Sequence, residues 1–257
     1  RGKVRAVDGL GLTVGRGEMV GLVGASGCGK SATALALVGL LPQPTGRVTG
    51  GRALLLERDL LSMSPAHLLR VRGRQVGLVF QEPLSALNPV MRVGEQIAEG
   101  VRLHRVESKA GARALAIELM ERFGIPGASQ RYGAYPHQLS GGMRQRVMLA
   151  MALAGQPELI IADEPTTALD PTIQAQVMDL LDTLRAEQGV GVLLITHDLR
   201  LAAQRCSRLN VMQQGRIVEH GPTPRLLEHA THAYTIELLE LAREQAPEAL
   251  ARGGGEG

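Results

Sequence analysis

The sequence is poor in aromatic residues and in cysteine, and it contains no tryptophan. Its 257 residues include two Phe, three Tyr and two Cys. Two cysteines supply neither a disulfide framework nor the spacing of a metal site, which fits a reducing compartment. With so few aromatic rings, the core must be built from Leu, Val, Ile, Ala and Met. A net charge of +3 without a basic tract argues against nucleic acid as the main ligand.

Long apolar runs are also missing. No run reaches the roughly 20 residues that a membrane-spanning helix needs. The segment from Arg1 to Asp8 lacks the pattern of a secretory signal peptide. Because there is no initiator methionine, we expect the natural N-terminus to lie upstream. If a protein of this kind works at a membrane, it must dock onto a separate partner.

Apolar β-branched runs alternate with helical patterns, which is typical of a parallel sheet covered by helices. The pattern predicts strands over 19–23, 47–56 (antiparallel), 75–80, 159–163 and 190–196, and a closing hairpin over 208–212 and 216–219. Helical patterns cover 31–41, 110–123, 141–154, 224–229 and 235–244, and a helix is expected after each of the strands 159–163 and 190–196. Strand signals vanish between Val93 and about Ala154, so we expect an inserted helical subdomain there.

A glycine loop follows the first predicted strand. Gly24 to Ser31 reads Gly-Ala-Ser-Gly-Cys-Gly-Lys-Ser, which matches the P-loop pattern between a strand and a helix. Such a loop points backbone N–H groups at a phosphate, and the following helix N-terminus adds positive potential. Lys30 is predicted to reach the β- and γ-phosphates, and the Ser31 hydroxyl to bind Mg²⁺. The strand-loop-helix context disfavours a chance match in a chain with 32 glycines.

Polar side chains follow three further predicted strands. Asp163 and Glu164 end an apolar strand, and successive strand residues point in opposite directions. We therefore expect Asp163 to hold Mg²⁺ through water and Glu164 to accept a proton from the attacking water. Gln81 is predicted to touch Mg²⁺ or that water, and His197 to hydrogen-bond the γ-phosphate. The alternative, solvated surface residues, is disfavoured by their shared position at strand ends in a chain that carries a P-loop.

A second glycine turn occurs at Ser140-Gly141-Gly142, just before a predicted helix. One chain has no obvious use for two phosphate-cradling elements. The second turn therefore indicates that ATP is gripped from two sides, by two molecules.

These motifs resemble, in order and spacing, those of the ATP-binding subunits of ABC transporters. They are the Walker A loop 24–31, the Q-loop Gln81, the signature 139–145, Walker B 159–164, the D-loop 168–170 and the switch His197. The resemblance implies an α/β fold, a P-loop NTPase (RecA-like) core with an antiparallel β subdomain and an inserted α-helical subdomain. We expect the core at 1–92 and 156–230, the helical signature subdomain at 93–155, and a C-terminal helix and flexible tail at 231–257.

The same resemblance implies an ATPase that binds ATP and Mg²⁺ and works as a dimer. Ser140 and Gly142 of one subunit would face the ATP held by the P-loop of the other, and Asp170 would cross the interface. The implied nucleotide contacts are Gly24, Ala25, Ser26, Gly27, Cys28, Gly29, Lys30, Ser31, Ala32, Ser140, Gly141, Gly142, Gln145 and Asp170. The implied catalytic residues are Glu164, His197 and Gln81, and the implied metal ligands are Ser31, Gln81 and Asp163.

A narrower resemblance, to the dipeptide, oligopeptide and nickel importer branch, lies in five stretches: 80–89, 93–96, 135–138, 162–170 and 232–235. It implies an ATPase at the cytoplasmic face of the plasma (inner) membrane that powers uptake of peptides or a related solute such as a nickel chelate. Its partners would be a second ATPase, homologous or a copy of itself, two permeases and, indirectly, an extracytoplasmic solute-binding protein. A permease coupling helix would dock near Glu82 to Met91.

Two departures from the family pattern bear on the site. No aromatic residue precedes Phe80, so the adenine ring is expected to contact either a residue upstream of the chain or aliphatic groups near Val4 to Ala6. No Cys follows Cys206, so we expect no iron–sulfur cluster.

Two other functions compete with import. One is a soluble ABC ATPase of DNA repair or translation, disfavoured because no heptads separate the Walker motifs and the chain holds one cassette. The other is a non-hydrolysing regulatory subunit, disfavoured because Glu164, Ser140, Gly142 and His197 are all present.

Overall fold

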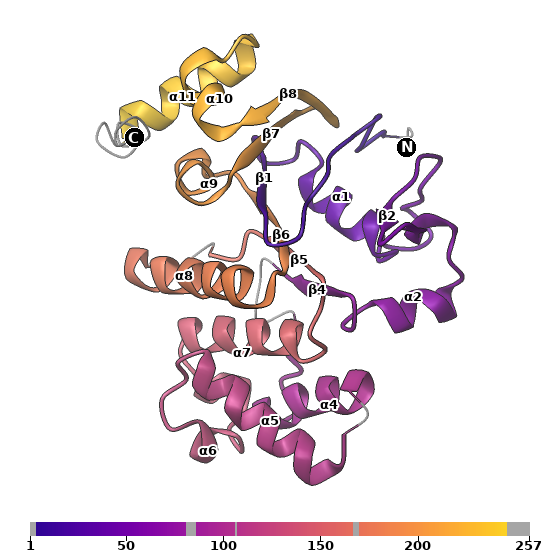
Figure 1. Cartoon of the computed structure of the whole chain (residues 1–257), viewed down its shortest axis with the longest axis vertical. Coiled ribbons are helices and arrows are strands. Elements are labelled where there is room, and N and C mark those ends of the chain that lie inside the picture. Colours follow the sequence, from indigo (N-terminus) through magenta and orange to yellow (C-terminus); the bar gives the residue numbers. More distant parts are fainter. Residues whose placement is uncertain (1–3, 81–85, 106, 167–169, 246–257) are drawn as a thin grey trace. The chain divides into compact units, whose positions relative to one another are not determined.

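The computed structural model describes residues 4–80, 86–105, 107–166 and 170–245, and it has the α/β architecture expected from the sequence (Figure 1). The chain forms two compact units. The first combines residues 1–65 with 191–257, and the second is residues 66–190. Each unit has its own strands and helices.

Four strands make the sheet of the first unit. In spatial order they are β6 (Gly191–Thr196), β1 (Met19–Val23), β7 (Arg208–Gln213) and β8 (Arg216–Pro222). β1 runs parallel to both of its neighbours, and β8 pairs antiparallel with β7. Every residue of β1 and β6 is buried, as expected for parallel strands that are covered on both faces.

Helices flank these strands in the first unit. They are α1 (Lys30–Leu37), α9 (Leu199–Arg205), α10 (Thr223–His229) and α11 (Ala233–Gln245). Figure 1 shows α1 on one side of the strands and α9 on the other. Asp198 caps α9 by accepting hydrogen bonds from the amides of Arg200 and Leu201. Helix α10 packs on β7, β8 and α9, and α11 packs on α9.

A small antiparallel pair, β2 (Leu54–Leu55) with β3 (Arg58–Asp59), leads into a 3₁₀ turn, η1 (Leu60–Ser62). The sequence pattern predicted an antiparallel strand over 47–56, and only Leu54–Leu55 of that span forms one. The preceding stretch carries Pro42, Pro44, Gly46, Gly50 and Gly51. Proline cannot donate to a strand ladder and glycine weakens one, so extended chain here does not pair.

The second unit has two parallel strands, β4 (Val76–Val79) and β5 (Leu159–Asp163), and a group of helices. The helices are α2 (Pro65–Val71), α4 (Val93–Arg105), α5 (Lys109–Arg122), α6 (Ala128–Arg131), α7 (Gly141–Leu153) and α8 (Pro171–Gln188), with the 3₁₀ turn η2 (Pro136–Gln138) before α7. Figure 1 shows α4 to α7 gathered as one helical group. Their apolar residues recur at helical spacing, for example Ala112, Ala116 and Met120, all fully buried on α5.

Most predicted elements are confirmed, and one helix was missed. The strands predicted at 19–23 and 159–163 have those bounds in the structure. Between 93 and 154 the described residues form helices and no strand. The missed helix is α2, although Ser64 followed by Pro65 is a helix-start signal. The predicted domain boundaries themselves stay a prediction. Within the described residues, no helix is both long and apolar enough to cross a bilayer.

Candidate functional site

The residues predicted to hold nucleotide are divided between the two units, and the phosphate loop belongs to the first. It joins β1 to α1. Lys30 is only 5% exposed, and its Nζ donates hydrogen bonds to the carbonyl oxygens of Gly24 at 2.8 Å and Ala25 at 3.0 Å. An ammonium group has three protons to donate. Two of the three protons therefore hold the Lys30 ammonium against the loop.

Three glycines shape this loop for different reasons. A Cβ on Gly24 would overlap the carbonyl oxygen of Met212, and one on Gly29 would overlap that of Ala6. Gly27 has φ +79°, a left-handed conformation, and a Cβ there would have no atom within 4 Å. The loop is thus packed tightly against its own unit at two glycines and open at the third. This is the form of a backbone cradle for phosphate.

The turn between β7 and β8 braces the phosphate loop. The amide of Gly215 donates to the carbonyl oxygen of Cys28 at 2.8 Å, and the amide of Asp8 donates to the carbonyl oxygen of Gly215 at 2.8 Å. Cys28 is buried, and its Sγ lies 3.9 Å from the Nζ of Lys30. Cys28 therefore serves the loop through a small buried side chain and its backbone.

His197 follows β6 directly and is exposed. The amide of Asp198, the next residue, donates to the Thr196 hydroxyl at 2.9 Å, while the Asp198 carboxylate caps α9. The backbone on both sides of His197 is thus fixed by hydrogen bonds. A histidine held this way at a strand end suits a contact with a terminal phosphate.

Two acids end β5 in the second unit. Asp163 is buried, at 9% exposure, and Glu164 is half-buried. Glu164 has φ +47°, a left-handed conformation that is uncommon for a residue with a side chain. Such strain costs on the order of 1–3 kcal/mol and clusters at active sites. The strand therefore ends in a bend that re-aims the Glu164 side chain.

The second glycine turn forms the start of α7. The Ser140 hydroxyl accepts a hydrogen bond from the amide of Met143 at 3.3 Å, so Ser140 is the N-cap. A Cβ on Gly142 would lie 2.9 Å from a methyl group of Ile173 on α8, whereas one on Gly141 would meet nothing within 4 Å. Gly142 thus permits close packing of two helices, and Gly141 leaves the helix start open.

Two predicted contact residues already have partners within the second unit. Gln145 is 2% exposed, and its side-chain amide donates to the carbonyl oxygen of Pro165, just after the two acids. Asp170 is exposed and caps α8 by accepting from the amides of Thr172 at 3.1 Å and Ile173 at 3.0 Å. Gln145 therefore joins helix α7 to the segment that follows β5. Gln81, like Ala168 and Leu169 of the D-loop, lies outside the described residues.

The donor set fits magnesium bound together with nucleotide. Among residues that the structure describes, no group of three or more His, Cys, Asp or Glu could hold a metal ion. Mg²⁺ prefers oxygen ligands and typically combines one or two protein oxygens with water and phosphate oxygens. The Ser31 hydroxyl and the Asp163 carboxylate are oxygens of this kind. When bound, the ion neutralises charge on the β- and γ-phosphates.

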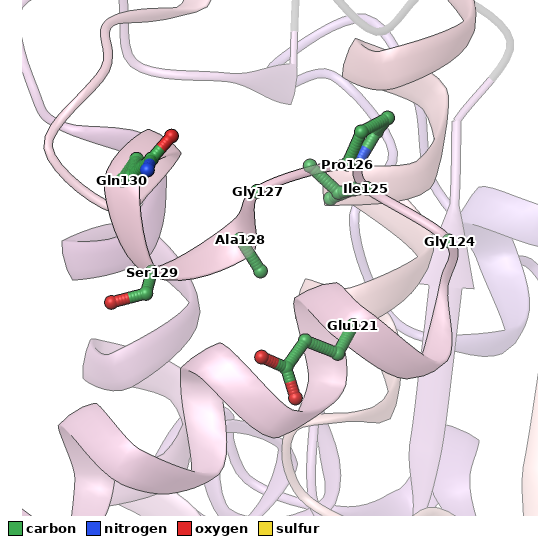
Figure 2. A pocket seen from close by; sticks show the side chains of 8 residues that line it. All are labelled: Glu121, Gly124, Ile125, Pro126, Gly127, Ala128, Ser129 and Gln130. Atoms are coloured by element: carbon green, nitrogen blue, oxygen red, sulfur yellow. The ribbon is translucent and has the colours of Figure 1, made fainter.

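A hollow of about 500 Å³ in the second unit does not suit a nucleotide. It is lined by Glu121 and residues 124–130, between the end of α5 and α6 (Figure 2). Its one ionisable lining residue is the carboxylate of Glu121, which would repel phosphate. The shape of the surface therefore does not by itself mark the site.

Gln96 has a structural task that its place in a sequence motif did not reveal. It is 5% exposed, and its side-chain amide donates to the carbonyl oxygens of Asn88 at 3.0 Å and Met91 at 2.9 Å. Its Oε1 accepts from the Asn88 amide at 2.9 Å. The turn from Asn88 to Met91 is thus clamped onto α4, with Val90 82% exposed at its tip.

Sequence reasoning also missed the contact of Tyr234 with the phosphate loop. The amide of Ala25 donates a hydrogen bond to the Tyr234 hydroxyl at 2.8 Å, across 209 positions of sequence. Sequence singled out Tyr234 only as part of a motif shared with one branch of a family. No local pattern connects it with a loop at the other end of the chain.

Comparison with known proteins identifies this arrangement. A family model described as ABC transporter matches residues 7–167. A probable peptide ABC transporter ATP-binding protein of Sinorhizobium fredii is 48% identical over 235 residues, which is 91% of this chain and 70% of that protein. A candidate peptide import ATP-binding protein of Brucella melitensis is 47% identical over 242 residues, 92% of this chain and 72% of that protein.

Solved structures agree with the sequence relatives. A dimeric ATP-binding cassette in a post-hydrolysis state, with ADP and Pi bound, superposes with a TM-score of 0.75 at 30% identity, covering 86% of this chain and 91% of that chain. A Clostridium perfringens protein that is part of an ABC transporter complex superposes with a TM-score of 0.74 at 25% identity, covering 96% of this chain and 91% of that chain.

Proposed function

The chain belongs to the ABC transporter family, and on that premise we propose that it powers peptide import. It is the ATP-hydrolysing subunit of a transporter and uses ATP with Mg²⁺. The proposal that the cargo is a peptide rests on two relatives that are named for peptide transport. They are 47% and 48% identical to this chain over more than nine-tenths of its length.

We assign the chemistry of hydrolysis to the residues that the sequence motifs predict. Lys30 and the amides of the loop bind the β- and γ-phosphates, and Ser31 and Asp163 hold Mg²⁺. Glu164 accepts the proton of the attacking water, which is the task for which its left-handed backbone re-aims it. His197 hydrogen-bonds the γ-phosphate and so senses whether it is present. Gln81 is proposed as a further Mg²⁺ or water contact.

We propose that the exposed start of α7 completes the ATP site of a partner ATPase. Ser140 and Gly141 are exposed, and the helix N-terminus adds a positive potential that favours phosphate. In support, the solved cassette with ADP and Pi bound is a dimer in its post-hydrolysis state. The mass of the ATP-bound complex, measured with and without a sister ATPase, distinguishes a second copy from a sister subunit.

Gly141→Glu is expected to abolish ATP-driven pairing without unfolding the chain. Gly141 is exposed and a Cβ there meets no atom within 4 Å, so the change in stability should stay within about 0.5 kcal/mol. A carboxylate at this position would instead repel the phosphates of a partner's ATP. Light scattering with ATP and thermal unfolding are the two measurements.

The matched control for this variant is Gly133→Glu, in the same unit. Gly133 is also exposed, and a Cβ there also meets nothing within 4 Å. This variant should pair as the unmodified chain does. Normal pairing of Gly141→Glu would remove the start of α7 from the interface.

The clamped turn from Asn88 to Met91 is our proposed docking point for a permease. Its backbone is fixed by Gln96, and Val90 presents an apolar side chain to solvent. A rigid turn with an exposed apolar tip can transmit movement from the ATPase to a coupling helix. We place the protein at the cytoplasmic face of the plasma membrane, with an extracytoplasmic solute-binding protein that delivers the cargo.

Loss of this protein should stop the uptake of a labelled dipeptide, while uptake of the free amino acid continues. Cells that lack the chain would be complemented with the unmodified protein or with Glu164→Gln. Only the unmodified protein should restore uptake. If dipeptide uptake survives deletion while uptake of a nickel chelate fails, the cargo is the chelate and the peptide proposal is wrong.

A further inference from the structure

The contact between the start of α11 and the phosphate loop has a function of its own. We propose that the Tyr234 hydroxyl is a positioning group of the ATP site, which sets the Ala25 peptide of the phosphate loop and ties helix α11 to the nucleotide. The inference concerns the ATP site and holds whatever the cargo is.

Ala25 is the residue at which two restraints on the loop meet. Its amide donates to the Tyr234 hydroxyl at 2.8 Å, and its carbonyl oxygen accepts from the Nζ of Lys30 at 3.0 Å. The same carbonyl oxygen accepts from the amide of Cys28 at 3.3 Å, which closes the turn of the loop. The Ala25 amide shares its rigid peptide group with the Gly24 carbonyl, which also accepts from the Nζ of Lys30, at 2.8 Å. A tilt of that peptide group would therefore move an oxygen that holds the phosphate-binding ammonium.

Tyr234 can position the loop because the segment that carries it is itself anchored. The Glu219 carboxylate on β8 accepts from the amide and hydroxyl of Thr231, at 2.7 and 3.0 Å, and from the amide of His232 at 3.2 Å. The amide of Tyr234 donates to the Nδ1 of His232 at 3.2 Å. A continuous set of hydrogen bonds thus runs from β8 to the phosphate loop.

The charge state of Glu219 supports this anchor. Burial acts to raise its pKa, but the hydrogen bonds from Thr231 and from the amide of His232 act against it, and the pKa of Glu219 lies below its usual value. The group is therefore an ionised acceptor at neutral pH. Hydrogen bonds to a charged acceptor are about twice as strong as neutral ones.

The expected size of the effect follows from the exposure of the loop. Ala25 is exposed, so a water molecule can accept the hydrogen bond of its amide when the Tyr234 hydroxyl is removed. What is lost is the fixed position of the loop. One hydrogen bond of this kind corresponds to about a two- to tenfold change in an equilibrium constant. Tyr234→Phe removes the hydroxyl and keeps the ring, so it leaves the packing of α11 unchanged.

The test is the affinity of the purified full chain for Mg-ATP, measured by calorimetry. Tyr234→Phe should weaken binding about two- to tenfold with an unchanged melting temperature. The control is Tyr132→Phe, which removes the hydroxyl that donates to Glu95 in the other unit. It should bind ATP as the unmodified chain does. Unmodified affinity in Tyr234→Phe would overturn the proposal.

A double-mutant cycle separates positioning from general loosening. Glu219→Ala removes the anchor of the segment and should weaken ATP binding through the same contact. The double variant with Tyr234→Phe should then be no weaker than the weaker single variant. If the two effects multiply, the anchor and the hydroxyl act independently, and the route from β8 to the loop is wrong.

Because the chain has few tyrosines, the environment of Tyr234 can be followed directly by ¹⁹F NMR. With three tyrosines in all, a protein labelled with 3-fluorotyrosine has three ¹⁹F resonances, and the Tyr234→Phe spectrum identifies the one from Tyr234. Addition of Mg-ATP should shift that resonance, because the hydroxyl contacts the loop that binds phosphate. A Tyr234 resonance that stays in place at saturating Mg-ATP would contradict the coupling.

Discussion

Glu164→Gln is expected to lower the rate of ATP hydrolysis at least about 100-fold while leaving ATP binding intact. A positioned general base contributes about 10²–10⁴-fold to a rate, and an amide cannot take the proton of the attacking water. The left-handed backbone at Glu164, which is uncommon for a residue with a side chain, supports this assignment. The measurement is steady-state phosphate release together with a separate ATP-binding isotherm.

The control for this variant is Glu158→Gln, just before the other end of β5. Its turnover should match that of the unmodified chain. The variant Glu164→Gln should in addition hold ATP in a closed pair of subunits, because the step that opens the pair no longer occurs. If Glu164→Gln released phosphate at the unmodified rate, the proton acceptor would be another group.

Replacing Lys30 should weaken ATP binding strongly. Hydrogen bonds to charged groups contribute about 1.5–3 kcal/mol, so Lys30→Ala is expected to weaken the affinity for Mg-ATP about 10- to 150-fold. Lys30→Arg should weaken it as well. The ammonium lies in a space that leaves Lys30 5% exposed, and a planar guanidinium is too large and too rigid to replace a compact ammonium there.

The matched control for Lys30→Arg is Lys109→Arg, the same exchange at an exposed position. Lys109 is the first residue of α5 and is exposed. The chain uses 25 arginines and three lysines, so arginine is well tolerated elsewhere. This variant should bind ATP normally. An unchanged affinity in Lys30→Arg would mean that the cradle needs only a positive charge.

Residues close in sequence determine the features that sequence analysis found. The strands β1 and β5 are continuous apolar runs, and the phosphate loop combines glycines at fixed spacing with a strand before it and a helix after it. These signals are local, so they can be read without the fold. The predicted roles of the loop and of the acids after β5 rest on the same local patterns.

The features that the sequence did not reveal depend on distant contacts. The hydrogen bond from Ala25 to Tyr234 joins residues 209 positions apart. The inward turn of Gln145 requires the loop after β5, 20 positions away. The left-handed backbone of Glu164 has no signature, because glycine or asparagine, and not glutamate, normally marks such a conformation. Proline and glycine before β2 explain why the predicted antiparallel strand shortened.

The measurement that tests the composite ATP site most directly is the mass of Glu164→Gln in solution with Mg-ATP. It would be made on the chain alone and on the chain co-expressed with any ABC ATPase that its neighbouring genes encode. We predict that ATP moves the 27.3 kDa chain into a complex of two ATPase subunits in at least one of these preparations, and that Gly141→Glu prevents it. A chain that is saturated with ATP and stays at 27.3 kDa in both preparations would contradict the account.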